Sequence, residues 1–327
     1  MTERRSPSVV LPALAGLVAA FVGLLVAMIA PLAAAPLTEG DGDIVAFANS
    51  PFPYAGIIPI KDIPFLDVTD GARRGHTSPR AGRVYWEDET YSDRRSLIYF
   101  PKGFDIDRPA VIVVFFHGNS ATLERDVVAR QQVPRQVAGS GLTAVLLAPQ
   151  FALDAIDSSS GNFWTPGVFA RYLDEASAKM AAVYGDKSAR AAFARMPVIL
   201  LAYSGGYNAA AYAAAVGGAE DRIAGVILID ALYAEEDKFA DWFARNRGHA
   251  FLFSAYTKSA APSNAVLGEL LTERGIDFTR RTPPRLTPGT VALFATDPEL
   301  VHDDLVTRAW VKDPVAWLLG RVEGYLR

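Results

Sequence analysis

The chain has 327 residues, a net charge of −4 at neutral pH and no cysteine, and 50% of its residues are apolar. This length suggests one large domain or two small ones, with enough apolar residues for a sizeable core. The absence of cysteine excludes disulfides, thiolate metal sites and a cysteine nucleophile. The weakly acidic balance, without a long Lys/Arg cluster, argues against a nucleic-acid partner.

The N-terminal region has the composition of an export signal or a membrane anchor. Arg4 and Arg5 precede residues 9–30, which are almost continuously apolar. About 20 such residues span a bilayer, so this segment favours an uncleaved anchor. A cleavable signal peptide is the alternative, because the alanines at 33–35 offer a small-residue cleavage site. Residues 1–35 are therefore predicted to place the rest of the chain outside the cytoplasm, either periplasmic or secreted.

Residues 36–80 are rich in Pro, Gly and Asp, which predicts a tether and an irregular lead-in. Residues 81–327 are predicted to form one domain, because strand-like runs recur there. The later runs are continuously apolar, as in strands that are buried on both faces. Eight strands are predicted, at residues 83–91, 95–101, 110–116, 142–148, 197–203, 225–229, 250–255 and 290–295.

Helical patterns separate most of these strands. They occur at residues 123–137, 168–183, 208–216, 236–245, 263–274 and 305–326. Pro134 is expected to break or kink the first helix. The alternation predicts an α/β fold with a mostly parallel sheet and helices on both faces. The first two strands suggest an antiparallel edge, and the short connections leave no room for a large lid domain.

The most informative motif is Ala-Tyr-Ser-Gly-Gly around Ser204, which joins an apolar strand to a helix of small residues. It has the outline of a nucleophile elbow, a turn so sharp that the positions two before and two after the serine must be small. Here these positions hold Ala202 and Gly206, whereas the usual pattern has Gly at both. Ser263 also has small residues on either side, but no strand leads into it. Ser204 is therefore the predicted nucleophile.

The order of elements resembles the α/β-hydrolase superfamily over about residues 83–327. The resemblance includes eight strands in order, an elbow after the fifth, His117-Gly118 after the third and His302 after the eighth. It implies an α/β-hydrolase fold with a Ser-His-acid triad. No metalloprotease, phosphate-loop or dinucleotide-binding motif is present in the sequence, so no cofactor or metal is expected.

A serine hydroxyl needs a base to accept its proton, and four histidines are available. The superfamily carries its base after the eighth strand, which assigns this role to His302. His76 lies in the polar lead-in and is expected to be solvated. His249 precedes the seventh strand and is expected at the strand edge.

The acid that orients the base is less certain from the sequence. Most members of the superfamily carry it after the seventh strand, but residues 254–261 contain no carboxylate. Asp230 closes the sixth strand, where the pancreatic-type lipases among others carry their acid. Asp230 is therefore the predicted acid, and Asp297 is the alternative.

The oxyanion hole is expected between the third strand and the elbow. The backbone N–H groups of Asn119 and Gly205 are the predicted donors. His117 and Gly118 are expected to hold and turn the loop. Pocket candidates at the same edge of the sheet are Tyr203, Tyr207, Gln150, Trp164 and Tyr233.

The sequence thus predicts an extracytoplasmic serine hydrolase that acts on an ester of a small or lipid-like acyl substrate. An amide or peptide bond is an alternative substrate, and an acyltransferase would use the same triad. A different class of function is an inactive domain of this fold that serves the cell envelope as a binding or scaffold protein.

Overall fold

The computed structural model describes residues 40–327. The predicted anchor or signal at residues 1–35 lies outside the described residues. Within residues 40–327, no helix combines the length and apolar character that crossing a bilayer requires.

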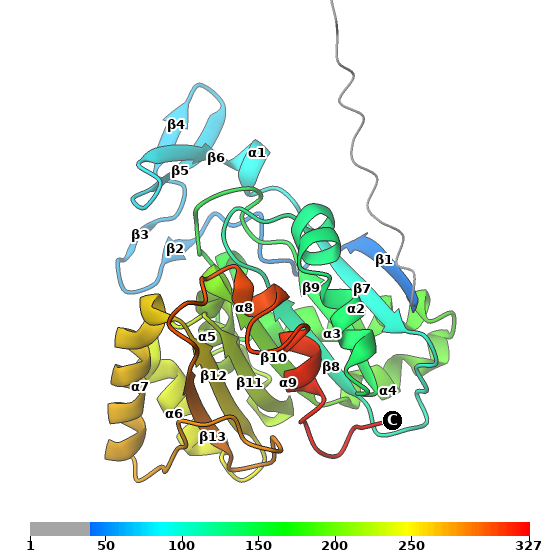
Figure 1. Ribbon diagram of the computed structural model, residues 1–327. Coiled ribbons are helices and arrows are strands. Elements are labelled where there is room, and N and C mark those ends of the chain that lie inside the picture. The colour runs from blue at the N-terminus through cyan, green and yellow to red at the C-terminus, as the bar shows by residue number, and fades with distance from the viewer. Residues whose placement is uncertain (1–39) are drawn as a thin grey trace, which may run out of the picture. The chain divides into compact units, whose positions relative to one another are not determined.

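A central eight-stranded sheet organises the described residues (Figure 1). Its spatial order is β1-β7-β9-β8-β10-β11-β12-β13, which is 1-2-4-3-5-6-7-8 when the strands are numbered along the chain. The pairs β1–β7 and β7–β9 are antiparallel, and the remaining pairs are parallel. The strands are β1 (Gly40–Ala46), β7 (Arg95–Pro101), β8 (Val111–Phe116), β9 (Ala144–Pro149), β10 (Val198–Tyr203), β11 (Ile223–Ile229), β12 (Phe251–Tyr256) and β13 (Val291–Ala295).

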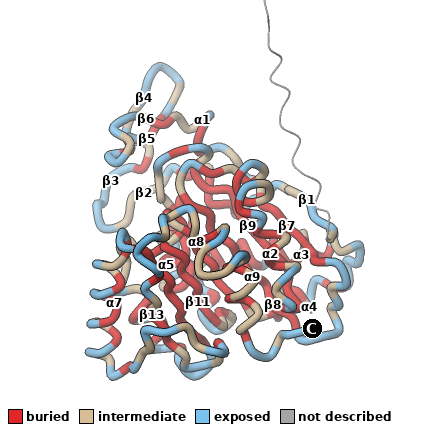
Figure 2. The backbone as a smooth tube through the Cα atoms, in the orientation of Figure 1, coloured by how far each residue is buried: buried red, intermediate tan, exposed pale blue. Residues whose placement is uncertain are grey.

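Both faces of this sheet are buried, which explains the continuous apolar runs of its central strands (Figure 2). In β8, for example, Ile112 and Val114 join one core cluster, whereas Val111 and Val113 join the other. Successive side chains of a strand point to opposite faces, so each central strand must be apolar throughout.

Helices cover each face of the sheet and supply the rest of the two clusters. The first face is covered by α3 (Val168–Val183), α4 (Arg190–Arg195), α5 (Tyr207–Ala215), α6 (Glu236–Asn246) and α7 (Ala261–Glu273). The second face is covered by η1 (Leu123–Arg130), α2 (Val133–Gly139), α8 (Asp304–Thr307) and α9 (Pro314–Leu319). Shorter turns are η2 (Gly161–Trp164), η3 (Lys187–Ala189), η4 (Ser204–Gly206), η5 (Glu220–Arg222) and η6 (Lys258–Ala260).

Two helices differ from their prediction. The helix expected at residues 123–137 is divided into η1, a π-helical segment, and α2. The division falls at Gln132, whose φ of 51° is left-handed, so that Pro134 lies in the first turn of α2, where proline is tolerated. The helix expected at residues 305–326 is replaced by the short helices α8 and α9.

The lead-in also differs from its prediction, because it is an integral part of the fold. β1 pairs with β7 along its whole length and forms the edge of the central sheet. Phe47, Phe52 and Phe65 are at most 1% exposed and belong to the first core cluster. The domain of described residues therefore begins at or before Gly40, rather than at residue 81.

The strand predicted at residues 83–91 does not join the central sheet. Its first half is β6 (Arg83–Trp86), followed by the single helical turn α1 (Glu87–Thr90). β6 belongs to a small antiparallel sheet with β4 (Val68–Asp70) and β5 (Arg73–Ser78), and β2 (Ile57–Ile58) pairs with β3 (Ile63–Pro64). Side chains of this region bind the loop after β9: Ser78 Oγ donates to the Ile156 carbonyl, and Tyr85 Oη accepts from the Ile156 N–H.

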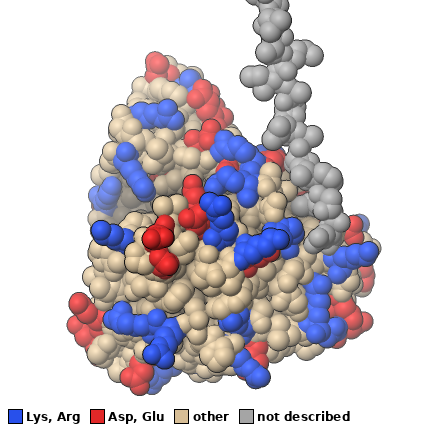
Figure 3. Space-filling view, viewed as in Figure 1, with Lys and Arg blue, Asp and Glu red and all other residues tan. Residues whose placement is uncertain are grey.

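Charged side chains of both signs are interspersed on the face shown in Figure 3. Exposed ion pairs of the described residues include Arg73 with Asp88 at 2.7 Å and Arg285 with Glu323 at 2.6 Å. Exposed pairs of this kind contribute little to stability, typically below about 1 kcal/mol.

Candidate active site

Ser204 occupies a sharp turn between β10 and α5. Its φ of 54° is left-handed, which is uncommon for a residue other than glycine. A Cβ atom on Gly206 would lie 2.2 Å from the Phe116 carbonyl oxygen, so that position accepts only glycine. Ala202, on the other side of the turn, is fully buried beside Phe116. The tight turn projects the serine from the carboxyl end of the strand.

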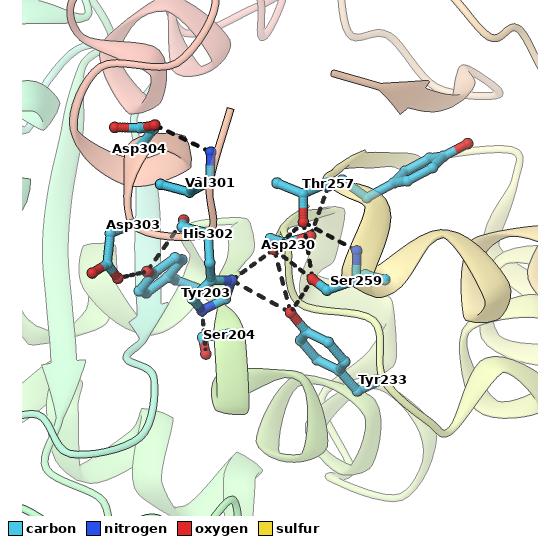
Figure 4. A network of polar contacts seen from close by, with 12 residues as sticks. Tyr203, Ser204, Asp230, Tyr233, Thr257, Ser259, Val301, His302, Asp303 and Asp304 are labelled. Carbon is cyan, nitrogen blue, oxygen red and sulfur yellow. Dashed lines mark hydrogen bonds and ion pairs between the residues drawn. The ribbon is translucent and has the colours of Figure 1, made fainter. Parts of the chain in front are cut away.

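A chain of hydrogen bonds joins three of the predicted site residues (Figure 4). Ser204 Oγ lies 2.7 Å from His302 Nε2, and His302 Nδ1 lies 2.6 Å from Asp230 Oδ2. Asp230 directly follows β11, and His302 lies between β13 and α8. Because β10, β11 and β13 are parallel members of one sheet, their carboxyl ends bring these side chains to the same edge.

Asp230 is fully buried and accepts several hydrogen bonds. The Thr257 N–H donates to Oδ1, and the Thr257 hydroxyl donates to Oδ2, each at 2.8 Å. Burial by itself raises the pKa of Asp230, but the His302 imidazole and the two Thr257 donors outweigh it, so the pKa is lower than usual. The ionised carboxylate therefore accepts the Nδ1–H of His302, which leaves Nε2 free to accept from Ser204.

The residues after β12 donate hydrogen bonds to Asp230 rather than supplying a carboxylate. Thr257 and Ser259 follow this strand, and the Ser259 hydroxyl lies 3.3 Å from Asp230 Oδ2. Sequence reasoning missed both residues, because local sequence does not indicate a contact with a residue that follows another strand. Asp297 lies in an exposed turn, where its carboxylate accepts from the Glu299 N–H.

Two predicted pocket residues instead surround the imidazole of His302. The Tyr203 ring stacks on the His302 ring with centroids 4.9 Å apart, and its hydroxyl donates to Asp303 at 3.0 Å. On the other side, the Tyr233 hydroxyl lies 3.3 Å from Asp230 Oδ2 and 3.4 Å from His302 Nδ1. These contacts restrict the orientation of a side chain that is itself 35% exposed.

The buried imidazole of His117 links the loop after β8 to the chain after β9 by hydrogen bonds. Its Nε2 accepts from the Phe151 N–H at 2.9 Å and from the Gln150 amide at 3.0 Å. Its Nδ1 therefore carries the proton and donates to the Gly118 carbonyl at 2.8 Å. Gln150, which was predicted to line the pocket, is fully buried behind this loop, so that prediction was wrong.

The loop after β8 passes very close to Ser204. A Cβ atom on Gly118 would lie 2.6 Å from Ser204 Cβ and 3.1 Å from Ser204 Oγ, so only glycine fits there. Within residues 40–327, the backbone N–H groups of Asn119 and Gly205 donate to no other residue. Both amides are thus available to an oxygen atom bound beside Ser204.

The arrangement of strands and turn decides the fold. An eight-stranded sheet of order 1-2-4-3-5-6-7-8 carries a serine elbow after its fifth strand and a histidine after its eighth. The fold is that of the α/β-hydrolases. No family model and no curated protein matches the chain.

Several solved α/β-hydrolase structures are similar to this chain. A feruloyl esterase module from Clostridium thermocellum aligns at TM-score 0.47 and 15% identity, over 84% of this chain and 97% of the other. An S-formylglutathione hydrolase from Agrobacterium tumefaciens aligns at 0.39 and 12%, over 78% and 97%. Esterase 2 from Thermogutta terrifontis aligns at 0.41 and 12%, over 69% and 84%. Similarities this distant carry no conclusion about activity or substrate.

A cavity of about 340 Å³ lies beside the start of α5, the helix that follows the elbow, and its lining does not include Ser204, His302 or Asp230. The predicted pocket residues Tyr207 and Trp164 line it, and Trp164 also donates to Asn208 at 2.8 Å. The lead-in forms the facing wall through residues 58–61, His76 and Pro79. Sequence reasoning did not predict that the lead-in would line this cavity.

His76 differs from its prediction, because it is buried rather than solvated. Its ring stacks on Phe65 with centroids 4.3 Å apart, and its Nδ1 lies 2.7 Å from the Phe65 carbonyl. His249 is exposed in the turn before β12, and Ser263 lies in the first turn of α7. None of these three residues contacts the Ser204–His302–Asp230 chain in the part that the structure describes.

Burial lowers the pKa of His117 to about 4, whereas an unfolded histidine titrates near pH 6.5. The folded state thus binds fewer protons, and stability is lost as the pH falls from about 6.5 toward 4. We expect the free energy of unfolding to fall by about 2 kcal/mol between pH 7 and pH 5 from this group. Urea unfolding at the two pH values measures it.

The exposed His249 provides the control. His249→Gln should keep the pH dependence, and His117→Gln should flatten it between pH 7 and pH 5. A wild-type protein whose stability does not change over this range would contradict the expectation.

Proposed function

We propose that the chain is a serine hydrolase that cleaves a carboxylic ester through an acyl-enzyme. The observation that carries the proposal is the continuous hydrogen-bonded chain from Ser204 through His302 to Asp230. A serine that donates to a histidine, itself oriented by a buried carboxylate, is the arrangement that activates a hydroxyl for acyl transfer.

In the proposed reaction, Ser204 Oγ attacks the carbonyl carbon while His302 Nε2 takes its proton. Asp230 stabilises the resulting imidazolium, and the Asn119 and Gly205 amides donate to the oxyanion. One such donor contributes roughly 3–4 kcal/mol to lowering the barrier. His302 then protonates the leaving alcohol, and water, activated by the same histidine, releases the acid.

An ester of a small or lipid-like acyl group is the substrate class that we propose. The cavity beside the elbow is partly apolar through Ile58, Trp164 and Tyr207, and its volume of about 340 Å³ suits a short acyl or alcohol group. Amide hydrolysis and transfer of the acyl group to another acceptor would use the same residues. Product analysis with ester, amide and alcohol acceptors distinguishes these reactions.

Labelling with a fluorophosphonate probe tests the proposal. We expect wild-type protein to be labelled and to hydrolyse p-nitrophenyl acetate, with both signals lost in Ser204→Ala. Ser263→Ala is the matched control and should behave as wild type. Well-folded wild-type protein that neither reacts with the probe nor hydrolyses esters would support a binding or scaffold function instead.

We also propose that the enzyme acts outside the cytoplasm, in the periplasm or as a secreted protein. The support is the basic and then apolar composition of residues 1–35. Cell fractionation followed by N-terminal sequencing tests this location. A start near residue 36 would mean a cleaved signal, an intact start in the membrane fraction would mean an anchor, and cytoplasmic protein would refute both.

A further inference from the structure

Arg80 lies in the turn between β5 and β6, and its guanidinium reaches the oxyanion loop. The Asn119 amide satisfies its neighbours when its nitrogen donates to Ser158 Oγ at 3.0 Å and to the Asp157 carbonyl at 2.9 Å. In that orientation the amide oxygen accepts from Arg80 Nη1 at 3.3 Å. A residue of the lead-in thus contacts the loop that supplies a proposed oxyanion donor.

This contact brings the positive charge close to the nucleophile. A Cβ atom on Gly205 would lie 2.2 Å from the terminal amide atom of Asn119, so the Asn119 side chain packs directly on the residue after Ser204. Burial raises the pKa values of Tyr207 and Tyr233, and the charge of Arg80 acts in the opposite direction on both. Arg80 is therefore within electrostatic range of both sides of the elbow.

Two of the other three arginines of this small sheet pair with carboxylates, and the third, Arg83, lies over the Tyr85 ring. Arg73 pairs with Asp88 and Glu89, and Arg74 pairs with Glu87. In contrast, Arg80 forms no ion pair with any carboxylate of residues 40–327. Its hydrogen bond to a neutral amide uses one of the five donors of the guanidinium, which leaves the others for a ligand.

We propose that Arg80 is a specificity-determining residue that binds a carboxylate carried by the ester substrate. The proposal rests on the serine hydrolase function proposed above. A guanidinium binds a planar carboxylate with two parallel hydrogen bonds, which gives orientation as well as attraction. The substrate class is then an ester with a free carboxylate a few bonds from the reacting carbonyl, such as a half-ester of a dicarboxylic acid.

The surroundings favour a single negative charge over a phosphate group. Asp157, Glu235 and Lys61 are the charged residues that line the cavity beside the elbow. The Glu235 carboxylate is balanced by Lys238 at 2.5 Å, and the Asp157 carboxylate accepts from the Tyr91 hydroxyl at 2.7 Å. One guanidinium offsets one negative charge on the substrate, whereas a second negative charge would be repelled by Asp157.

The experiment follows p-nitrophenolate release by the full-length protein from two esters with the same acyl chain: p-nitrophenyl hemiglutarate, which carries a carboxylate, and its methyl ester. The quantity measured is the ratio of kcat/KM for the charged ester to kcat/KM for the neutral one. We expect Arg80→Gln to lower this ratio about tenfold and Arg80→Lys to lower it about threefold. In wild type the ratio should also fall as salt is added.

Arg83→Gln is the matched control, because Arg83 lies on the same hairpin with its guanidinium over the Tyr85 ring. It removes the same charge and should leave the ratio unchanged. An unchanged ratio in Arg80→Gln would overturn the proposal while leaving the hydrolase function intact. A larger dependence on Arg80 for a phosphate-bearing ester would overturn the assignment to a carboxylate. Wild-type protein that hydrolyses neither ester and resists the fluorophosphonate would instead refute the hydrolase function.

Discussion

Replacing Asp230 with asparagine is expected to lower kcat for ester hydrolysis by about 10⁴-fold. The ionised carboxylate holds His302 in the form whose Nε2 is free to accept the serine proton. An asparagine amide that donates to Nδ1 would move the imidazole proton to Nε2, where it blocks that transfer. Steady-state kinetics on p-nitrophenyl acetate measures the loss.

Asp297→Asn is the control, because Asp297 is the other carboxylate that the sequence offered as the acid. It lies in an exposed turn, so its replacement should change kcat less than about twofold. Asparagine matches aspartate in shape, and thermal unfolding of both variants separates lost activity from lost folding. The reverse order of the two effects would show that the acid has been assigned incorrectly.

Removing the lead-in is expected to abolish folding of the α/β-hydrolase domain. A fragment that starts at residue 81 lacks Phe47, Phe52 and Phe65, each at most 1% exposed. Burial of one such ring contributes about 1.5–3 kcal/mol, so the three together approach the whole stability of a typical domain. The fragment also lacks β1, which leaves the backbone of β7 unpaired at the sheet edge.

Size-exclusion chromatography and thermal circular dichroism of fragments 81–327 and 40–327 test this expectation. The shorter fragment should aggregate or unfold without a cooperative transition, whereas the longer one should fold. Phe52→Ala in the full chain is the milder variant and should lower the free energy of unfolding by about 3–5 kcal/mol. A soluble 81–327 fragment with the same Tm as the 40–327 fragment would show that the lead-in is not required for folding.

The sequence predicts best those elements whose side chains are buried. The helix expected at residues 168–183 coincides with α3, and β8 to β12 lie within two residues of their predicted starts. These elements carry continuous or periodic apolar patterns, because packing on the sheet requires them. The elbow at Ser204 could be recognised for a related reason, since Gly206 is required by the close Phe116 carbonyl and Gly118 by the close Ser204 side chain.

Elements held by backbone pairing or by contacts distant in the chain could not be predicted from the sequence. β1 has the sequence GDGDIVA and is largely exposed, so its pairing with β7 leaves no apolar pattern. His76 and Gln150 are polar, and only the tertiary structure shows that they are buried with hydrogen-bond partners. Thr257 and Ser259 reach Asp230 from a different strand, a contact that local sequence does not indicate.

The left-handed backbone at Ser204 also has a cost in stability. Asp230 shares this conformation, with a φ of 42°. For residues other than glycine, such conformations cost on the order of 1 kcal/mol or more each. In the serine hydrolase proposed above, glycine would relieve this cost at Ser204 but would remove the nucleophile, so stability and the proposed chemistry make opposite demands at that position. At Asp230 the hydrogen bonds from Thr257 offset the backbone cost.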